Sequence, residues 1–465
     1  MKFETIKNKK KILLIGIILF CIGVTLFLAT SLANYRKVQS IPIASGKVNY
    51  IVPDMNIVAI NLQTGTDEEG NITYDSATSV PKFGYVLNTE KSYCANYNES
   101  TKELEKINNT IEYDRYNKMT SIKTPDTLMN KGTKCYFYYD KGITISEILA
   151  SKEITTRTDY SVVFTEDTTG KLFEAQDDDG TTYYYAGAPT DNFVEFAGFY
   201  WRIIRINGNG SVRMIYQGKK YDENGNKLDV KTVGAETEAA YSMFSNVYFQ
   251  SAVAEHVGLK YTEGEVHGTD EKSTILKNLE SWYSGEDNEL KKYEEHLDRE
   301  SGFCGDRSIT SGTGIGTSST YYGAHTRLVT NKAPSYKCPY VDESGIQQDL
   351  YTVENNTNKG NQALTYPVGL ITADEVSFAG GVYNINNTSY YLYTGKEYWT
   401  MTPSRFNYSY YPRLFHLYEN DDYNGALNAG YTVDMAMGIR PVINLNTVKL
   451  TMTGSGTIID PYVIS

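Results

Sequence analysis

Few residues in this chain have the types and spacing that catalysis or metal binding needs. Cys304 and His325 could form a nucleophile and a base, but no acidic residue lies at a recognisable spacing from them. Asn420–Gly425 begins like a calcium loop, yet its twelfth position is Tyr431, where a bidentate glutamate is needed. Gln176–Gly180 also lacks ligands at the later positions. We therefore expect no active site, no metal and no cofactor, and interpret Asn420–Gly425 as a hairpin turn.

A stronger signal lies between Trp399 and Arg440, where aromatic residues are interspersed with Arg and Asn. Tyrosine accounts for 41 of the 465 residues, and it supplies rigid contact area at a small loss of side-chain entropy. Such a mixture is typical of binding surfaces. A tyrosine-rich hairpin that only packs on its neighbours would have the same composition, so both interpretations stay open. The predicted ligand-binding residues are Trp399, Arg405, Tyr408, Tyr410, Arg413, His416, Tyr418, Asn420, Tyr423 and Tyr431.

The cysteines fall into two local pairs and one isolated residue. Cys21 lies within an apolar run and is expected to pack there as a small apolar side chain. Proximity along the chain predicts the disulfides Cys94–Cys135 and Cys304–Cys338, although four cysteines allow three pairings. A metal site is the alternative, but the sequence has no CxxC motif and no histidine at ligand spacing from these cysteines.

Strands and short helices must position these residues. Two β-rich runs flank Asn207–Gly210 and predict a hairpin between residues 196 and 216. Ser273 to Tyr283 has helical apolar spacing, and a second helix is expected at about 288–297. Thr372 and Glu375 have the spacing of a capping box before an apolar run, and Gly380 is expected to end that helix.

The N-terminal region predicts a membrane anchor. Ile12 to Thr30 is uncharged and mostly apolar, and as a helix it would span about 28 Å, close to the thickness of a bilayer core. Lysines precede it, so the tail at residues 1–11 is expected in the cytoplasm. We predict a single-pass anchor at Ile12–Asn34; a signal peptide cleaved near Ala33 is the alternative.

Charge and length restrict the partners and the domain organisation. The chain has a net charge of −12, while residues 1–37 carry +6, so the predicted extracellular part carries −18. Such an acidic body would repel phosphate backbones, and we expect no nucleic-acid partner. Short strands between turns predict a small β-sandwich module at 48–139. Residues 141–465 are expected to form a second, larger domain.

Three blocks near the C-terminal end carry a family resemblance. LITADEVSFAGG at 370–381, YWTMTPS at 398–404 and GIRPVI at 438–443 resemble motifs of formylglycine-generating-enzyme-like and Fibrobacter major-paralogous domains. The resemblance implies a C-type-lectin-like fold for 141–465. Residues 181–465 also look like a group of membrane-anchored proteins of low-GC Gram-positive and wall-less bacteria. The enzymatic members need a cysteine pair late in the domain, and no cysteine follows Cys338, so their chemistry is not expected here.

Together these observations predict an α+β protein with an N-terminal transmembrane helix, a small β-sandwich and a C-terminal C-type-lectin-like domain. Its expected location is the cell membrane, with both domains outside. The predicted function is recognition or adhesion, with an unknown protein or glycan as ligand and a tyrosine-rich surface as the contact. A structural or self-assembling envelope component is the alternative function, and an enzyme is less favoured.

Overall fold

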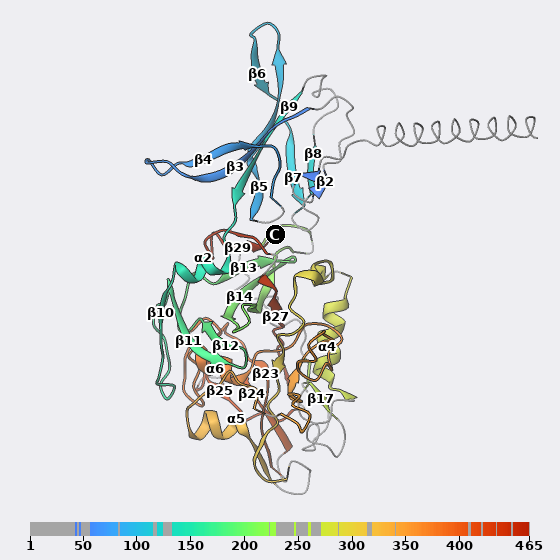
Figure 1. Ribbon diagram of the computed structural model, residues 1–465. Coiled ribbons are helices and arrows are strands. Elements are labelled where there is room, and N and C mark those ends of the chain that lie inside the picture. The colour runs from blue at the N-terminus through green and yellow to red at the C-terminus, as the bar shows by residue number, and fades with distance from the viewer. Residues whose placement is uncertain are drawn as a thin grey trace, which may run out of the picture. The chain divides into compact units, whose positions relative to one another are not determined.

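The computed structural model is rich in β-sheet and contains only short helices (Figure 1). The predicted α+β class is therefore confirmed in its coarse form, as a fold in which strands predominate. The described residues are 42–43, 46–47, 56–81, 84–114, 119–123, 133–222, 224–228, 246–247, 259–261, 271–286, 288–313, 319–339, 341–407, 411–419, 422–433, 435–447 and 450–464. The chain divides into two compact units. The smaller one has residues 1–60, 77–80 and 89–137, and the larger one has residues 61–76, 81–88 and 138–465.

The predicted cytoplasmic tail at 1–11 and the predicted anchor Ile12–Asn34 lie outside the described residues. None of the helices that the structure describes has the length and apolar character needed to cross a bilayer. The membrane anchor stays a prediction from the sequence.

The predicted module at 48–139 consists mainly of strands. Five strands form one sheet in the order β4-β3-β9-β5-β6, and β7 pairs with β8 in an antiparallel hairpin. Along β9, Cys135 and Phe137 are buried while Tyr136 is partly exposed, which is the period of two expected for a sheet with one covered face. The bounds are β1 (Pro42–Ile43), β2 (Gly46–Lys47), β3 (Asn56–Thr66), β4 (Ile72–Ala77), β5 (Tyr85–Asn98), β6 (Glu103–Lys106), β7 (Thr110–Asp114), β8 (Met119–Lys123) and β9 (Lys134–Lys141).

The centre of the larger unit is the hairpin of β14 and β15. Seven of the eight residues of β14 are buried, as in a strand covered on both faces, and β15 pairs with it through the Asn207–Gly210 turn. The predicted hairpin is confirmed. These strands belong to a nine-stranded sheet in which β15 also pairs with β27. The sheet contains β10 (Glu153–Thr155), β11 (Lys171–Asp177), β12 (Gly180–Tyr184), β13 (Phe193–Phe196), β14 (Phe199–Ile206), β15 (Val212–Lys219), β27 (Val442–Leu445), β28 (Met452–Thr453) and β29 (Tyr462–Ile464).

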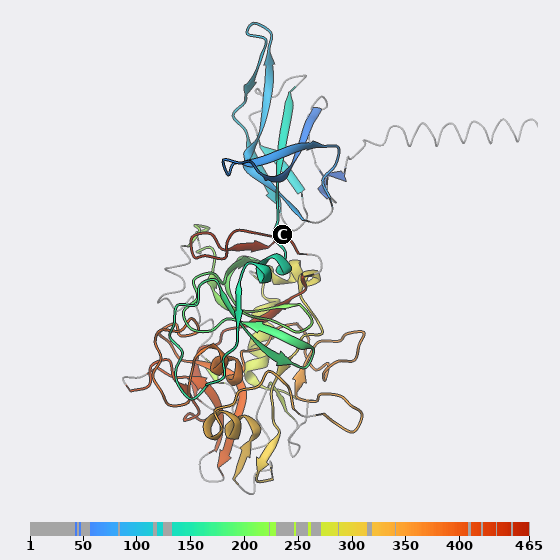
Figure 2. The ribbon, with the colours of Figure 1, turned by 60° about the vertical axis from the view of Figure 1, so that its left-hand side comes forward.

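A second sheet of five strands, which we call the aromatic sheet, has the order β20-β21-β23-β24-β25. Its orange strands lie below the green hairpin of the first sheet in both views (Figures 1 and 2). The pairing of β23 with β24 shifts register on both sides of Pro403, because proline cannot donate to the ladder. The bounds are β20 (Ile309–Ser311), β21 (Thr320–Tyr322), β23 (Tyr398–Asn407), β24 (Tyr411–Leu417) and β25 (Leu427–Asn428).

Short helices and two-stranded pairs complete the larger unit. The helices are α2 (Ile145–Ala150), α4 (Thr274–Ser284), α5 (Gly323–His325) and α6 (Ala373–Ala379), with a 3-10 helix η2 (Glu289–His296) and a π-helix η3 (Thr326–Thr330). The small strands are β16 (Asn246–Val247), β17 (Lys260–Tyr261), β18 (Glu271–Lys272), β19 (Phe303–Cys304), β22 (Leu350–Tyr351) and β26 (Ala436–Met437). The predicted helix at 273–283 is confirmed, and the one expected at 288–297 is a 3-10 helix.

Helix α6 is fully buried and has the predicted capping box. Thr372 Oγ1 accepts a hydrogen bond from the Glu375 backbone N–H at 3.1 Å, and the Glu375 carboxylate accepts one from the Thr372 N–H at 2.9 Å. The helix ends at Gly380, whose φ is +127°, and a Cβ there would lie 2.6 Å from the Phe164 carbonyl oxygen. Glycine is therefore required at this end of the helix.

Both predicted disulfides are confirmed. Cys94 is bonded to Cys135 at a sequence separation of 41, and Cys304 is bonded to Cys338 at a separation of 34. The second bridge ties strand β19 to the segment that follows η3. A crosslink of this kind stabilises the fold mainly by restricting the unfolded chain.

We expect the double variant Cys304→Ser/Cys338→Ser to lose about 2–4 kcal/mol of unfolding free energy, because the unfolded chain regains the freedom of that loop. Tryptophan fluorescence during urea unfolding measures this loss. As a control, a reducing agent should shift the wild type by a similar amount and leave the variant's main transition unchanged. An identical midpoint for variant and wild type would contradict the prediction.

Candidate functional site

Five of the predicted ligand-binding residues come together at one end of the aromatic sheet. The His416 ring, on β24, stacks on Tyr431 with centroids 5.0 Å apart and planes 11° from parallel. Tyr418 lies 5.2 Å from Tyr431, and the two hydroxyl groups are 3.2 Å apart. Tyr423 extends the cluster, with its ring 6.2 Å from that of Tyr418. We call these four rings, together with Trp399 below them, the aromatic cluster.

Burial divides the cluster into an outer part and a supporting part. Tyr423 is 38% exposed, and Tyr418 and Tyr431 are partly buried. Trp399 and His416 have 0% exposure, so a ligand cannot touch them in this structure. Their predicted role as ligand contacts is therefore corrected to support of the outer rings, because Trp399 packs edge-on against His416 at 5.5 Å.

Two of the remaining predicted residues lie toward the other end of the same strands. Arg405 on β23 and Arg413 on β24 are directly paired across the ladder. Directly opposite residues project from the same face of a sheet, so the two guanidinium groups belong to one surface. Tyr408, Tyr410 and Asn420 lie outside the described residues.

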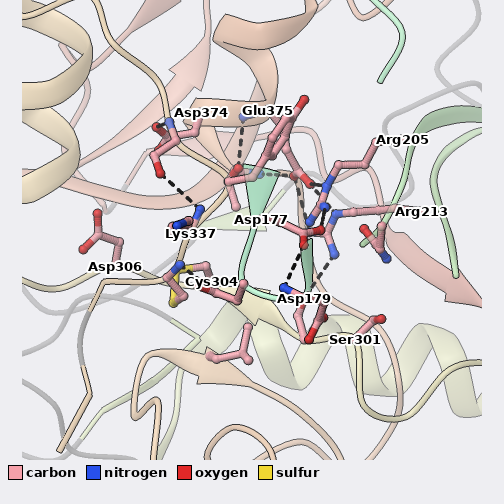
Figure 3. A pocket seen from close by; sticks show the side chains of 18 of the residues that line it. Asp177, Asp179, Arg205, Arg213, Ser301, Cys304, Asp306, Lys337, Asp374 and Glu375 are labelled. Carbon is pink, nitrogen blue, oxygen red and sulfur yellow. Dashed lines mark hydrogen bonds and ion pairs between the residues drawn. A yellow bond between two sulfur atoms is a disulfide. The ribbon is translucent and has the colours of Figure 1, made fainter. Parts of the chain in front are cut away.

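A second candidate site is a small polar cavity of about 50 Å³ in the larger unit, which sequence reasoning missed (Figure 3). Its walls come from the β11–β12 turn, the β14–β15 hairpin, the segment around the Cys304–Cys338 disulfide and the start of α6. Acidic and basic side chains both line it. The acidic ones are Asp177, Asp178, Asp179, Asp306, Asp374 and Glu375, and the basic ones are Arg205, Arg213, Arg327, Lys337 and Lys359.

Glu375 forms the most deeply buried ion pairs of this cavity. Its Oε1 lies 2.5 Å from Arg213 Nε and 3.3 Å from Arg205 Nε, and Figure 3 shows both guanidinium groups pointing toward it. Burial alone would raise the pKa of Glu375, but the charges of Arg213 and Arg205 lower it below its usual value. The carboxylate is therefore ionised and engaged with protein partners, and is unsuited to be a general acid.

Arg327 bridges two further carboxylates on the opposite wall. Its Nη2 lies 2.7 Å from Asp374 Oδ2 and 2.8 Å from Asp306 Oδ2, and its Nε donates to Asp374 Oδ1 at 2.7 Å. Burial raises the pKa of Asp306, opposed by the charge of Arg327. The Arg–carboxylate fork joins η3 to the N-terminus of α6 and to the loop after β19.

The three consecutive aspartates at the end of β11 each hold a different segment of the chain. Asp177 accepts hydrogen bonds from Arg205 Nη1 and from the Gly208 N–H, both at 2.8 Å. Asp178 accepts the Cys338 N–H at 3.0 Å, and Asp179 forms an ion pair with Lys359. These carboxylates fasten loops to the sheet. The run of aspartates is therefore explained by its protein partners and needs no calcium loop.

Cys304 and His325, which by residue type could be a nucleophile and a base, are each engaged with another residue. Cys304 is bonded to Cys338, and His325 Nδ1 lies 2.9 Å from the hydroxyl of Ser404, which is fully buried. Burial, and then the charge of Arg405, lower the pKa of His325 to about 4. Within the described residues, no group of three or more His, Cys, Asp or Glu could hold a metal ion.

We expect Arg327→Met to lower the unfolding free energy by about 3–5 kcal/mol at pH 7, because Asp306 and Asp374 would lose their cation inside the protein. Denaturant unfolding followed by tryptophan fluorescence measures the change. The matched control is Arg299→Met, since Arg299 is 42% exposed and its pair with Glu294 should contribute less than about 1 kcal/mol. Equal effects of the two substitutions would refute a structural role for this fork.

The burial of His416 leads us to expect that the stability of the protein depends on pH. Burial lowers its pKa to about 3, below the value of 6.5 in an unfolded chain. The neutral His416 ring therefore makes its full contribution to the unfolding free energy above about pH 6.5. This contribution is lost as pH falls toward 3, by up to about 1.4 kcal/mol per pH unit. We expect His416→Phe, which keeps an aromatic ring, to unfold with a flatter pH dependence between pH 6.5 and 4.5. Parallel curves for variant and wild type would contradict the buried neutral histidine.

Comparisons of the chain with protein-family models, with curated proteins and with solved structures found no match. The fold and the two candidate sites described above are therefore the basis for the functional conclusion.

Proposed function

We propose that the chain is a single-pass, membrane-anchored surface protein that recognises a protein or glycan ligand outside the cell. The apolar run at 12–30 and the lysines before it favour an anchor with the N-terminus inside. The two disulfides fit an oxidising compartment beyond the membrane. Adhesion to another cell or to an envelope polymer would be the biological form of such recognition.

The aromatic cluster is the single observation that carries this proposal. Tyr423 is exposed, while Tyr418 and Tyr431 are held by stacking and by a hydroxyl contact to each other. Their support, His416 and Trp399, is completely buried. Rings that are already fixed lose little entropy when a ligand binds, so a preorganised aromatic surface favours binding.

The polar cavity favours recognition over catalysis. Arg205, Arg213 and Arg327 are each paired with carboxylates of the chain, and the described cysteines are all in disulfides. Catalysis needs an acid, base or nucleophile with capacity left for a substrate. The cavity is better explained as the polar core that fixes loops to the sheet.

A C-type-lectin-like fold for 141–465 belongs to this proposal. The three sequence blocks that suggested it are adjacent in the larger unit. The Met401 N–H donates to the Ile371 carbonyl at 3.0 Å, which joins the strand block to the helix block. The Trp399 N–H donates to the Gly438 carbonyl at 3.1 Å, which joins the strand block to the terminal block. Their proximity is what one shared fold that contains all three motifs would require.

We expect Tyr423→Ala to weaken binding about tenfold, because an exposed tyrosine on a rigid support acts as an anchor. The full-length protein in detergent micelles would be tested on glycan arrays and on intact bacterial cells. Tyr221→Ala is the matched control, since Tyr221 is 44% exposed and lies outside the aromatic sheet.

Equal binding by wild type and Tyr423→Ala would contradict the proposal. Concentration-dependent self-assembly that only Tyr423→Ala abolishes would also contradict it, and would favour a structural component of the envelope.

A further inference from the structure

A buried ion pair between Lys152 and Asp191 lies apart from both candidate sites. The Lys152 side chain is 8% exposed, that of Asp191 is 6% exposed, and Lys152 Nζ contacts Asp191 Oδ2. Lys152 lies between α2 and β10, and Asp191 lies in the loop between β12 and β13. Neither residue lines the polar cavity or belongs to the aromatic sheet.

As an ion pair, these two groups leave buried polar atoms without partners. Asp191 Oδ2 accepts hydrogen bonds from Lys152 Nζ and from the Gly170 N–H, the latter at 2.8 Å. Asp191 Oδ1 is buried and has no hydrogen-bond partner among the described residues. The ammonium group has three N–H donors, and Asp191 Oδ2 is the one acceptor that it meets in the part of the chain that the structure describes. Buried charged groups are nearly always satisfied, so this pair requires an explanation.

Another lysine–carboxylate pair of the larger unit provides a comparison. Lys220 Nζ is paired with Glu195 Oε1, and Lys227 Nζ lies 3.4 Å from Glu195 Oε2, so both oxygens of this carboxylate have a cationic partner. The side chains of Lys220 and Glu195 are 18% and 12% exposed, which lets water reach the remaining donors. The pair of Lys152 and Asp191 differs in its deeper burial and in its unpartnered oxygen.

The nearby Arg202 does not need a charged Asp191. Its Nε donates to Asn192 Oδ1 at 2.6 Å, and its Nη2 donates to the Pro189 carbonyl at 2.8 Å. Both acceptors are neutral groups next to Asp191 in the same loop. The hydrogen bonds of Arg202 would therefore stay intact if Asp191 lost its charge.

We propose that Lys152 and Asp191 condense to an amide, which makes an intramolecular crosslink between their side chains. The ammonium group passes one proton to the carboxylate, and the free amine Nζ then attacks Asp191 Cγ. A bond forms between Nζ and Cγ, and the bond between Cγ and Oδ1 breaks. Oδ1 leaves as water with two of the three ammonium protons, and the third stays on the amide nitrogen. The reaction needs no oxidant, reductant or other reactant.

The amide removes the unsatisfied atoms, and burial favours its formation. Oδ1 is lost, and Oδ2 becomes the amide oxygen that still accepts the Gly170 N–H. Burial disfavours the charged forms of both groups and so favours the neutral amine and acid that react. Groups held in contact react as if their concentration were about 10⁵–10⁸ M, and a site that excludes water protects the product from hydrolysis.

The crosslink fastens the end of the nine-stranded sheet. Strand β10 has three residues, follows Lys152 directly and lies at the end of the strand order. Short strands at a sheet edge open more easily than central ones. With the amide in place, a force on the chain before Lys152 passes directly to the loop before β13 and does not pull β10 off the sheet. This inference goes beyond the proposed function and does not depend on it.

Mass spectrometry of the full-length protein, denatured and with its disulfides reduced, tests the crosslink. We expect the wild type to be lighter than its sequence by one water molecule, and Lys152→Met and Asp191→Ala to have their full masses. Trypsin should leave the bond after Lys152 uncut and release it joined to the segment of Asp191 as one branched peptide. The matched control is Lys220→Met, which should keep the loss of water.

A wild type of full mass would overturn the proposal, whether or not the variants fold. A loss of water that persists in Lys152→Met would also overturn it, because a cyclic imide formed by an aspartate alone loses water too. A branched peptide that joins a different lysine and carboxylate would place the crosslink elsewhere and contradict this assignment. Each of these results would leave recognition by the aromatic cluster untouched.

Discussion

The buried carboxylate of Glu375 is the interaction on which the architecture of the larger unit depends most. The same side chain closes the capping box of α6 and neutralises Arg213 and Arg205 on the central hairpin. Its position is reinforced two residues earlier, since the Ala373 N–H donates to Thr402 Oγ1 on β23 at 2.9 Å. Because buried charges must be paired, this carboxylate fixes the start of the helix against the nine-stranded sheet, and the Ala373–Thr402 hydrogen bond ties it to the aromatic sheet.

The polar cavity and the aromatic sheet use their side chains differently. In the cavity, arginines are paired with carboxylates, and the three aspartates at the end of β11 fasten separate loops to the sheet. On the aromatic sheet, the exposed Tyr423 extends a cluster of rings that rests on the buried His416 and Trp399. A closed network of charges stabilises a fold, whereas exposed rings on a rigid support are available to a partner. This difference is the reason why we assign structure to the cavity and recognition to the sheet.

Local signals in the sequence predicted much of the fold. The Asn207–Gly210 hairpin, the Thr372–Glu375 capping box and both disulfides depend on residues close in sequence or on few possible pairings, and they were recovered. The burial of Trp399 and His416 was not, because their composition fits a surface as well as a core, and only the packing of β24 on its neighbours decides between them.

The polar cavity also could not be predicted from the sequence alone. Asp177, Arg327 and Glu375 are far apart along the chain, and each has an ordinary local context. Their meeting depends on how β11, η3 and α6 pack, which no spacing rule encodes. The direct pairing of Arg405 with Arg413 follows from strand register, and register was likewise not available from the sequence.

Hydrogen exchange of the full-length protein, with and without the array glycan or cell-surface polymer that it binds most tightly, tests the central claim most directly. The account predicts that binding slows exchange in β21, β23 and β24 and in the segment that carries Tyr423 and Tyr431, with no change around the polar cavity. Protection confined to the β11–β12 turn and to the loop between Cys304 and Cys338 would contradict it, and would make the cavity the binding site.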